Sequence, residues 1–193
     1  MNIYLKHSLF AVIGFFLGSI PFGYIAGKIR GIDIKKYGSG NIGTTNVFRI
    51  LGIEWGIVVF ILDFLKGFVP VFISNRYIMY PELVALSAVL GHIYSPFLKF
   101  KGGKGVVTTI SVFSYLSLIP LLISLASWPI VFLITKTSSI SSLSFVIILP
   151  LVLLIMRGPG YLFYLSLVIL VVIVIAHIEN IKRILNGKEN RLK

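Results

Sequence analysis

The sequence predicts an all-α, polytopic integral membrane protein with about seven transmembrane helices, its N-terminus outside the cell and its C-terminus inside. Three observations lead to this fold class. First, 57% of the 193 residues are hydrophobic and only 12% are charged, too few charges to cover a soluble domain of this length. Second, apolar runs long enough to cross a bilayer recur along the chain. Third, the loops between them differ sharply in their Lys and Arg content.

The apolar runs are separated by polar, glycine-containing or proline-containing breaks, and each is read as one span. The first run lacks a basic leader and a small-residue cleavage site, so we expect it to be a retained helix. The fourth and fifth runs are short for a bilayer that needs about 20 helical residues, and without their division at Pro120 five or six spans would remain. The predicted spans are 5–28, 52–74, 81–98, 106–119, 121–136, 140–156 and 160–178.

Lys and Arg side chains set the orientation of these spans. Lys66 lies inside a span, and only Lys6, Arg76 and Arg157 fall on one side of the membrane. The other 14 of the 18 Lys and Arg residues fall on the opposite side, which the positive-inside rule places in the cytoplasm. The net charge of +12 is explained in this way, and we expect no nucleic-acid partner. The whole chain, residues 1–193, is read as a single membrane-embedded domain.

The second inner segment, "GHIYSPFLKFKGGKG", has the composition of an anion site. Lys101 and Lys104 surround Gly102, Gly103 and Gly105 just before an apolar span. Glycines allow successive backbone N–H groups to converge on an anion, and the following helix adds its positive N-terminal end. The spacing is not that of a Walker A loop. A plain cytoplasmic turn with topogenic lysines is the alternative.

The first inner segment contains "GSGNIGTTNVFR", which satisfies the dinucleotide pattern G-x-G-x-x-G. That pattern requires a strand before it and a βαβ unit around it, which two flanking membrane spans exclude. What remains is a dense set of hydroxyl and amide side chains followed by an arginine suited to phosphate. On a helix, Asn46 and Arg49 would share a face. The candidate binding residues here are Ser39, Asn41, Thr45, Asn46 and Arg49.

The remaining polar groups lie near the ends of spans or inside them. His177 and Asn180 are three apart where the last span ends, followed by a tail that includes Glu189 and is read as solvated and basic. Asp63 and Lys66 are three apart within a span and are read as an intrahelical ion pair. His92, near the inner end of the third span, either orients the glycine segment or contacts substrate.

Taken together, these motifs resemble the bacterial acyl-phosphate:glycerol-3-phosphate acyltransferases, the PlsY family. The similarity covers nearly the whole chain and includes "GSIPFGY", "GSGNIGTTN", "LDFLKG", "GHIYSPFLKFKGGKG" and "HIENIKRILNGKE". Two positions depart from the family pattern: Thr44 replaces the usual Ala, and Ile178 replaces a frequent basic residue. The resemblance implies seven helices, an external N-terminus and a multi-pass protein of the bacterial inner membrane whose active site is on the cytoplasmic face.

The resemblance also implies an activity. Such an enzyme moves an acyl group from acyl phosphate to the 1-hydroxyl of glycerol 3-phosphate, giving lysophosphatidic acid and phosphate at the start of phospholipid synthesis. By analogy, Lys104 and the glycines hold the acyl phosphate, and membrane lipids surround the protein. The residues implied to hold glycerol 3-phosphate are Ser39, Arg49, Lys104, His177 and Asn180.

Ser39, Lys104 and His177 are therefore the candidate catalytic residues, with His92 and Lys101 among the substrate-binding ones. Acyl phosphates are activated already, so positioning and electrostatics favour direct attack by the glycerol hydroxyl. A phosphate oxygen of the substrate accepts the proton in this interpretation, and His177 is the rival base. A covalent acyl-Ser39 is the disfavoured route, because the sequence marks no activating base. We expect no cofactor and no metal.

Two functions from other classes are alternatives at this point. A transporter for phosphorylated solutes would use Asp63 and Lys66 as a gating pair, although no inverted repeat is visible. A structural subunit would use its basic loops only to bind anionic lipid, which leaves the amide and hydroxyl residues of the loops unexplained.

Overall fold

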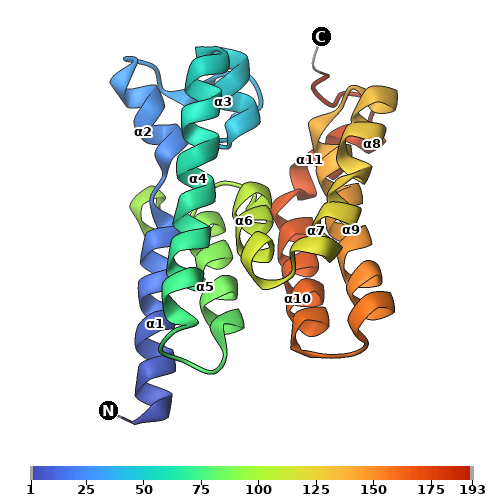
Figure 1. The fold of residues 1–193 in the computed structure, drawn as a ribbon. Coiled ribbons are helices and arrows are strands. Elements are labelled where there is room, and N and C mark those ends of the chain that lie inside the picture. The colour runs from blue at the N-terminus through green and yellow to red at the C-terminus, as the bar shows by residue number, and fades with distance from the viewer. Residues whose placement is uncertain (1, 192–193) are drawn as a thin grey trace. The chain divides into compact units, whose positions relative to one another are not determined.

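The computed structural model describes residues 2–191, and the secondary structure of that part of the chain is entirely helical (Figure 1). Lys193, one of the cations assigned to the inner side, lies outside the described residues. The chain divides between Tyr115 and Leu116 into two compact units, which we call unit 1 and unit 2. The predicted all-α class is confirmed.

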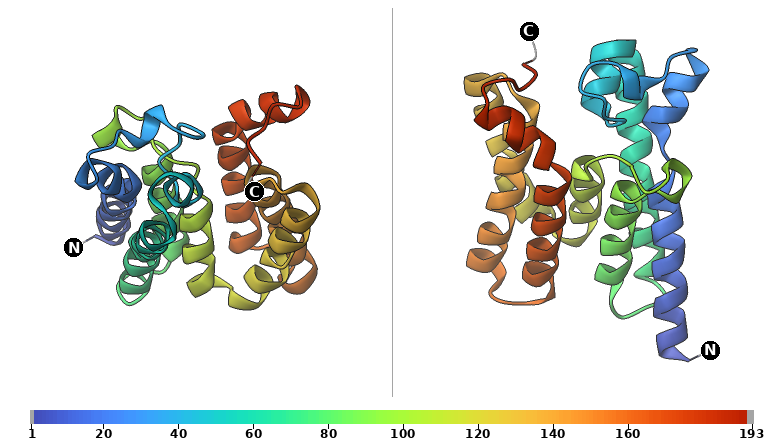
Figure 2. Two further views of the ribbon diagram at one scale, coloured as in Figure 1. Left: turned by 90° about the horizontal axis from the view of Figure 1, so that it is seen from above. Right: turned by 180° about the vertical axis from the view of Figure 1, so that it is seen from behind.

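Unit 1 is built on three long helices, with shorter elements at one end. Helix α1 packs along α5, and α4 packs against both, as Figures 1 and 2 show. Helices α2 and α3 lie at the end of the unit away from the N-terminus (Figure 1). The elements are α1 (Ile3–Ser19), α2 (Phe22–Ile29), the 3-10 turn η1 (Ile34–Lys36), α3 (Thr44–Leu51), α4 (Ile53–Ser74), α5 (Pro81–Ile93), η2 (Pro96–Leu98) and α6 (Val106–Leu116).

Glycines allow α1 and α5 to approach each other closely. A Cβ on Gly18 would collide with the Ala88 carbonyl, and one on Gly91 would collide with the Phe15 carbonyl. Small residues at helix contacts are typical of membrane proteins, in which dispersion packing drives association. The close contact joins the end of α1 near Ser19 to the end of α5 near Ile93, and the candidate site is built on those ends.

Unit 2 contains five helices packed mainly around α9. Helices α7, α8 and α10 all contact α9, and Trp128 Nε1 donates a hydrogen bond to Ser142 Oγ at 3.3 Å between α8 and α9. The elements are α7 (Leu118–Leu125), α8 (Ser127–Thr135), α9 (Ser138–Arg157), α10 (Tyr161–Ala176) and α11 (Ile178–Leu185).

Four helical stretches of the described chain are long and apolar enough to cross a membrane, at 3–29, 53–74, 118–135 and 138–157. A fifth is counted if α10 and α11, bent by 60° at their junction, form one span. Every predicted span contains a helix, but only four or five meet this criterion, so the count of seven stays a prediction.

Two predicted boundaries were wrong. The third span was expected to reach residue 98, whereas α5 ends at Ile93, because Pro96 disfavours helical backbone in the residue before it. The break expected at Pro120 lies instead at Ser117, whose φ is −162°. Pro120 falls in the first turn of α7, where a missing N–H costs nothing.

Candidate functional site

In unit 1, the first inner segment forms a loop over residues 36–46, from the end of η1 into the first turn of α3, which we call the first inner loop. It is folded around the side chain of Asn46, which is 2% exposed. Its Oδ1 accepts a hydrogen bond from the Ser39 N–H at 2.8 Å. Its Nδ2 donates to the carbonyls of Asn41 at 2.8 Å and Tyr37 at 3.1 Å, with a longer contact to Ile34 at 3.3 Å. Since these bonds occupy the amide, we infer that Asn46 shapes the loop from within.

An apolar cluster lies beneath this loop and connects it to the helices. Tyr24, Ile50 and Trp55 pack against its edges. The cluster contains residues from α2, η1, α3, α4 and η2, so the loop packs against five of the elements of unit 1. Its buried members are Ala26, Ile34, Ile42, Val47, Val59 and Leu98.

Helix α3 brings three of the predicted residues together. Asn46 and Arg49 share a face, as their spacing predicted, and Arg49 Nη1 lies 3.4 Å from Asn46 Oδ1. The same oxygen accepts from Ser39, so the half-buried guanidinium and the Ser39 segment are adjacent. Thr45 lies in the first turn of α3. The Oγ1 of the family-atypical Thr44 is buried and has no hydrogen-bond partner among the described residues.

The glycines of "GSGNIG" serve this loop and no nucleotide fold. Gly38 and Gly40 have φ of 61° and 72°, in the left-handed region that favours glycine. A Cβ on Gly38 would also collide with Asn46 Oδ1. Asn41 Oδ1 accepts the Gly43 N–H at 2.8 Å, which closes an Asx turn just before α3.

In the second inner segment, two of the three glycines of the predicted anion nest have their N–H groups occupied by the fold. The Gly102 N–H donates to the Ile93 carbonyl at 2.9 Å, and the Gly103 N–H donates to the His92 carbonyl at 3.0 Å. The last carbonyls of a helix need partners, so residues 99–105, the glycine loop, cap the end of α5. The N–H groups of Gly102 and Gly103 are therefore occupied. Gly105, with φ of 80°, leads the chain into α6.

Lysines remain the anion-suited groups of this segment. Lys101 is exposed, and half-buried Lys104 lies two residues before α6, whose first N–H groups have no intrahelical acceptor. Lys35 Nζ donates to the Lys101 carbonyl at 3.2 Å. This bond links the first inner loop to the glycine loop, so unit 1 brings both phosphate-suited segments into contact.

His92 lies behind the glycine loop and is 4% exposed. A Cβ on Gly103 would collide with His92 Nε2, and a Cβ on Gly102 would collide with the His92 carbonyl. Of the two roles that the sequence left open for His92, this geometry favours orientation of the loop. The contact with substrate stays a prediction.

Unit 2 contributes His177 and Asn180 at the bend between α10 and α11. His177 is 1% exposed, and its Nδ1 lies 2.9 Å from the Ile173 carbonyl. A carbonyl only accepts, so Nδ1 donates its proton in this contact. Asn180 is 3% exposed and follows in the first turn of α11.

Glu189 is the residue that the sequence interpretation misplaced. It was assigned to a solvated tail, but its side chain is 9% exposed. Its Oε1 accepts from Asn180 Nδ2 at 2.6 Å and from Ser139 Oγ at 2.9 Å, and its Oε2 pairs with Arg183 Nε at 2.8 Å. Burial raises the pKa of the Glu189 carboxyl, but these hydrogen bonds outweigh it and hold the pKa below its ordinary value. The available signal was an acidic side chain between Lys188 and Arg191.

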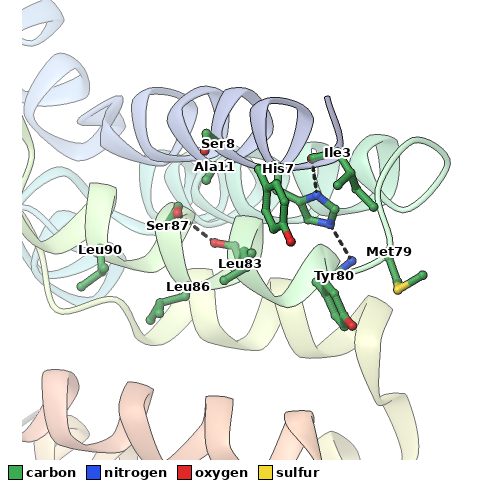
Figure 3. A pocket seen from close by; sticks show the side chains of 11 residues that line it. Ile3, His7, Ser8, Ala11, Met79, Tyr80, Leu83, Leu86, Ser87 and Leu90 are labelled. Atoms are coloured by element: carbon green, nitrogen blue, oxygen red, sulfur yellow. Dashed lines mark hydrogen bonds between the residues drawn. The ribbon is translucent and has the colours of Figure 1, made fainter. Parts of the chain in front are cut away.

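A separate hollow of about 620 Å³ lies between α1 and α5 at the end of unit 1 that carries the N-terminus (Figure 3). His7 Nδ1 donates to the Ile3 carbonyl at 2.8 Å beside it, and His7 Nε2 accepts from the Tyr80 N–H at 3.4 Å. Its lining contains none of the predicted site residues, so its size alone does not make it the active site. Across residues 2–191, no three His, Cys, Asp or Glu side chains are placed to hold a metal ion.

The sequence model of the glycerol-3-phosphate acyltransferase family matches residues 8–187 of this chain. The chain is 42% identical over 188 residues to the glycerol-3-phosphate acyltransferase of Fusobacterium nucleatum, covering 95% of this chain and 97% of the relative. It is 41% identical over 189 residues to that of Aquifex aeolicus, with 95% and 98% covered.

Two solved structures are similar over almost the full chain. One is the crystal structure of PlsY (YgiH), an integral membrane glycerol 3-phosphate acyltransferase, in its glycerol 3-phosphate form. It has a TM-score of 0.92 and 38% identity, covering 97% of this chain and 96% of that one. The lysophosphatidic acid form of PlsY has a TM-score of 0.90 at the same identity, with 97% and 95% covered.

Proposed function

This chain belongs to the glycerol-3-phosphate acyltransferase family, and on that premise we propose that its acyl donor is acyl phosphate and its acceptor the 1-hydroxyl of glycerol 3-phosphate. The enzyme is an acyltransferase that forms lysophosphatidic acid. The observation that carries the proposal is the full-length similarity to PlsY in both a glycerol 3-phosphate form and a lysophosphatidic acid form. This reaction would be the first step of phospholipid synthesis.

The acyl donor is assigned to the second inner segment. Lys104 supplies a point charge, and the first turn of α6 supplies N–H groups and a positive helix end. The glycines then act on shape: Gly102 and Gly103 hold the loop on α5, and Gly105 turns the chain into α6. Lys101 adds exposed positive charge nearby.

Glycerol 3-phosphate is assigned to the polar groups of the first inner loop. Arg49 has the planar fork that suits phosphate oxygens, and Ser39 is held next to it through Asn46. Asn41 and Thr45 supply further polar groups from the same loop and helix. The resemblance to the family also assigns His177 and Asn180 to this substrate.

The transfer proceeds by direct attack. The 1-hydroxyl oxygen forms a bond to the acyl carbonyl carbon, and the carbon–oxygen bond to phosphate breaks with its electron pair leaving on inorganic phosphate. The hydroxyl proton passes to a phosphate oxygen, with His177 as the rival acceptor. Lys104 and the helix end stabilise the charge on the leaving phosphate.

We also propose that the protein has seven spans in the bacterial inner membrane, with its N-terminus outside and its active site on the cytoplasmic face. Support comes from the uneven distribution of Lys and Arg. Helices α5 and α6, of 13 and 11 residues, would each rise only about 16 to 20 Å at 1.5 Å per residue, so their adjoining segments would complete the crossing. The family match runs across both units, which supports one acyltransferase domain over residues 1–193.

The test is turnover by purified protein in detergent. Given acyl phosphate and glycerol 3-phosphate, wild type is expected to form lysophosphatidic acid without any vesicle boundary, as a transporter or a lipid-binding subunit would not. Arg49→Ala and Lys104→Ala are expected to lower kcat/KM by about 100-fold or more. Matched controls are Arg30→Ala and Lys182→Ala, both exposed and expected within about twofold of wild type.

Absence of turnover, or full activity in both Arg49→Ala and Lys104→Ala, would contradict the assignment. Mass spectrometry after acyl-phosphate addition checks the route separately. An acyl group trapped on Ser39 would overturn direct attack.

A further inference from the structure

Helix α4 carries a buried ion pair that the proposed chemistry does not use. Lys66 Nζ lies 2.6 Å from Asp63 Oδ1, with side chains 2% and 3% exposed, as the sequence predicted for an intrahelical pair. Ionisable groups within a membrane span are costly and are seldom present without a function. The residues that surround this pair indicate what its function is.

Lys66 holds the break between α1 and α2. Its Nζ donates to the Ile20 carbonyl at 2.8 Å, next to Pro21, which cannot donate to the preceding turn. The ammonium also lies 5.6 Å from the centre of the Phe22 ring. One end of the pair is thereby fixed to the turn that starts α2 and supports the first inner loop.

Asp63 faces His92 on the other side. Asp63 Oδ1 lies 3.9 Å from His92 Nδ1, a distance at which the attraction is electrostatic, with no direct hydrogen bond. A carboxylate on this side favours the proton on Nδ1 and fixes the orientation of the ring. The rest of the ring then lies against Gly103, where no side chain would fit.

From these contacts we propose that Asp63 and Lys66 are positioning residues, which hold the glycine loop in place through His92. Three steps connect the pair to the loop: Asp63 orients the His92 ring, the ring packs on Gly103, and the His92 carbonyl accepts the Gly103 N–H at 3.0 Å. Lys104 is the next residue along the chain. The consequence for substrate rests on the proposed function, which assigns the acyl phosphate to this loop.

The test uses Asp63→Asn, which keeps the side-chain volume and removes the charge. Amide hydrogen exchange in residues 99–105 is expected to accelerate about tenfold, because Gly102 and Gly103 lose a fixed capping partner. The KM for acyl phosphate is expected to rise about tenfold while the KM for glycerol 3-phosphate stays within about twofold. The double variant Asp63→Asn/Lys66→Met is measured in parallel, since it leaves no lone charge in the membrane.

The matched control is Ser74→Ala at the other end of α4. Ser74 is fully buried and its Oγ donates to the Val71 carbonyl at 2.9 Å, so its loss perturbs the same helix away from the loop. Exchange in 99–105 is expected to equal wild type in this variant. Exchange that is unchanged in both Asp63 variants overturns the inference, as does equal acceleration in 99–105 and 36–46 in Asp63→Asn, which keeps Lys66 and in which that result would mean general loosening.

The two measurements separate this inference from the proposed function. Exchange decides whether the pair positions the loop, with or without activity. Accelerated exchange at an unchanged KM for acyl phosphate would support the positioning role and would contradict the assignment of that substrate to the glycine loop.

Discussion

Asn46→Ala is the most informative perturbation of the first inner loop. The side chain is 2% exposed and joins the start of α3 to the backbone on both sides of Ser39. Removing it leaves the Ser39 N–H and two carbonyls without their partner while the apolar cluster below remains. The loop is therefore expected to open locally, with the rest of unit 1 still folded.

The magnitude follows from the three shortest bonds, to Ser39 at 2.8 Å, Asn41 at 2.8 Å and Tyr37 at 3.1 Å. At about 1 kcal/mol net each, their loss costs about 3 kcal/mol. Since 1.4 kcal/mol is a factor of ten, the open population of the loop is expected to rise about 100-fold. The bonds to Ile34 and Arg49, at 3.3 and 3.4 Å, add little.

The assay combines hydrogen exchange of residues 36–46 with steady-state kinetics. Exchange there is expected to accelerate about 100-fold, and the KM for glycerol 3-phosphate to rise at least about tenfold because Ser39 and Arg49 lose their shared anchor. Asn46→Asp keeps the acceptor for Ser39 but places a carboxylate oxygen against three carbonyl oxygens. Its exchange rate and its KM for glycerol 3-phosphate are therefore expected to be at least as high as those of Asn46→Ala. The control is Asn75→Ala, an exposed asparagine far from this loop, whose Nδ2 donates to Tyr115 Oη at 2.9 Å.

The reasoning is refuted if Asn46→Ala keeps wild-type exchange and kinetics. It is also refuted if Asn46→Asp behaves as wild type, since the Nδ2 bonds would then contribute nothing.

Two further predictions concern Glu189 and Gly102. The pKa of Glu189 is lowered from its ordinary 4.5, so its stabilising effect is present above about pH 4.5 and is lost as pH falls through the folded-state pKa. Glu189→Gln is expected to lower Tm at pH 7, and the difference from wild type to close on acidification; a pH-independent difference would contradict this. Gly102→Ala places a Cβ against the His92 carbonyl, which is backbone and cannot move aside, so Tm and turnover are both expected to fall. Gly160→Ala meets nothing within 4 Å and is the silent control, and equal behaviour of the two alanine variants would speak against the steric argument.

In the first inner loop, the spacing of residues predicted which side chains share a helix face but not which groups they contact. The spacing of Asn46 and Arg49 was enough to place them on one helix face, because helical periodicity is local. It did not show that Asn46 points into the loop, since that depends on which carbonyls fold back toward it.

At the second inner segment, composition was a less reliable guide to which backbone groups are free to bind an anion. Glycines next to lysines are typical of an anion nest, but the N–H groups of Gly102 and Gly103 turned out to cap α5. A sequence lists potential donors, and only the folded chain shows which acceptors reach them first. The environment of Glu189 could not be predicted either, because Ser139, which donates a hydrogen bond to it, lies 50 residues away in the sequence.

By itself, the sequence determined that the chain is helical, embedded in a membrane and a member of its acyltransferase family. Hydropathy and short motifs carry that information locally, and a bilayer leaves few other ways to satisfy the polar backbone groups of an apolar segment. Only the tertiary structure decided which polar groups are occupied by the fold. The contacts of Asn46 inside its loop, of the Asp63–Lys66 pair with His92 and of Glu189 with Asn180 all depend on how the chain folds back on itself. A buried polar group without such a partner would be costly.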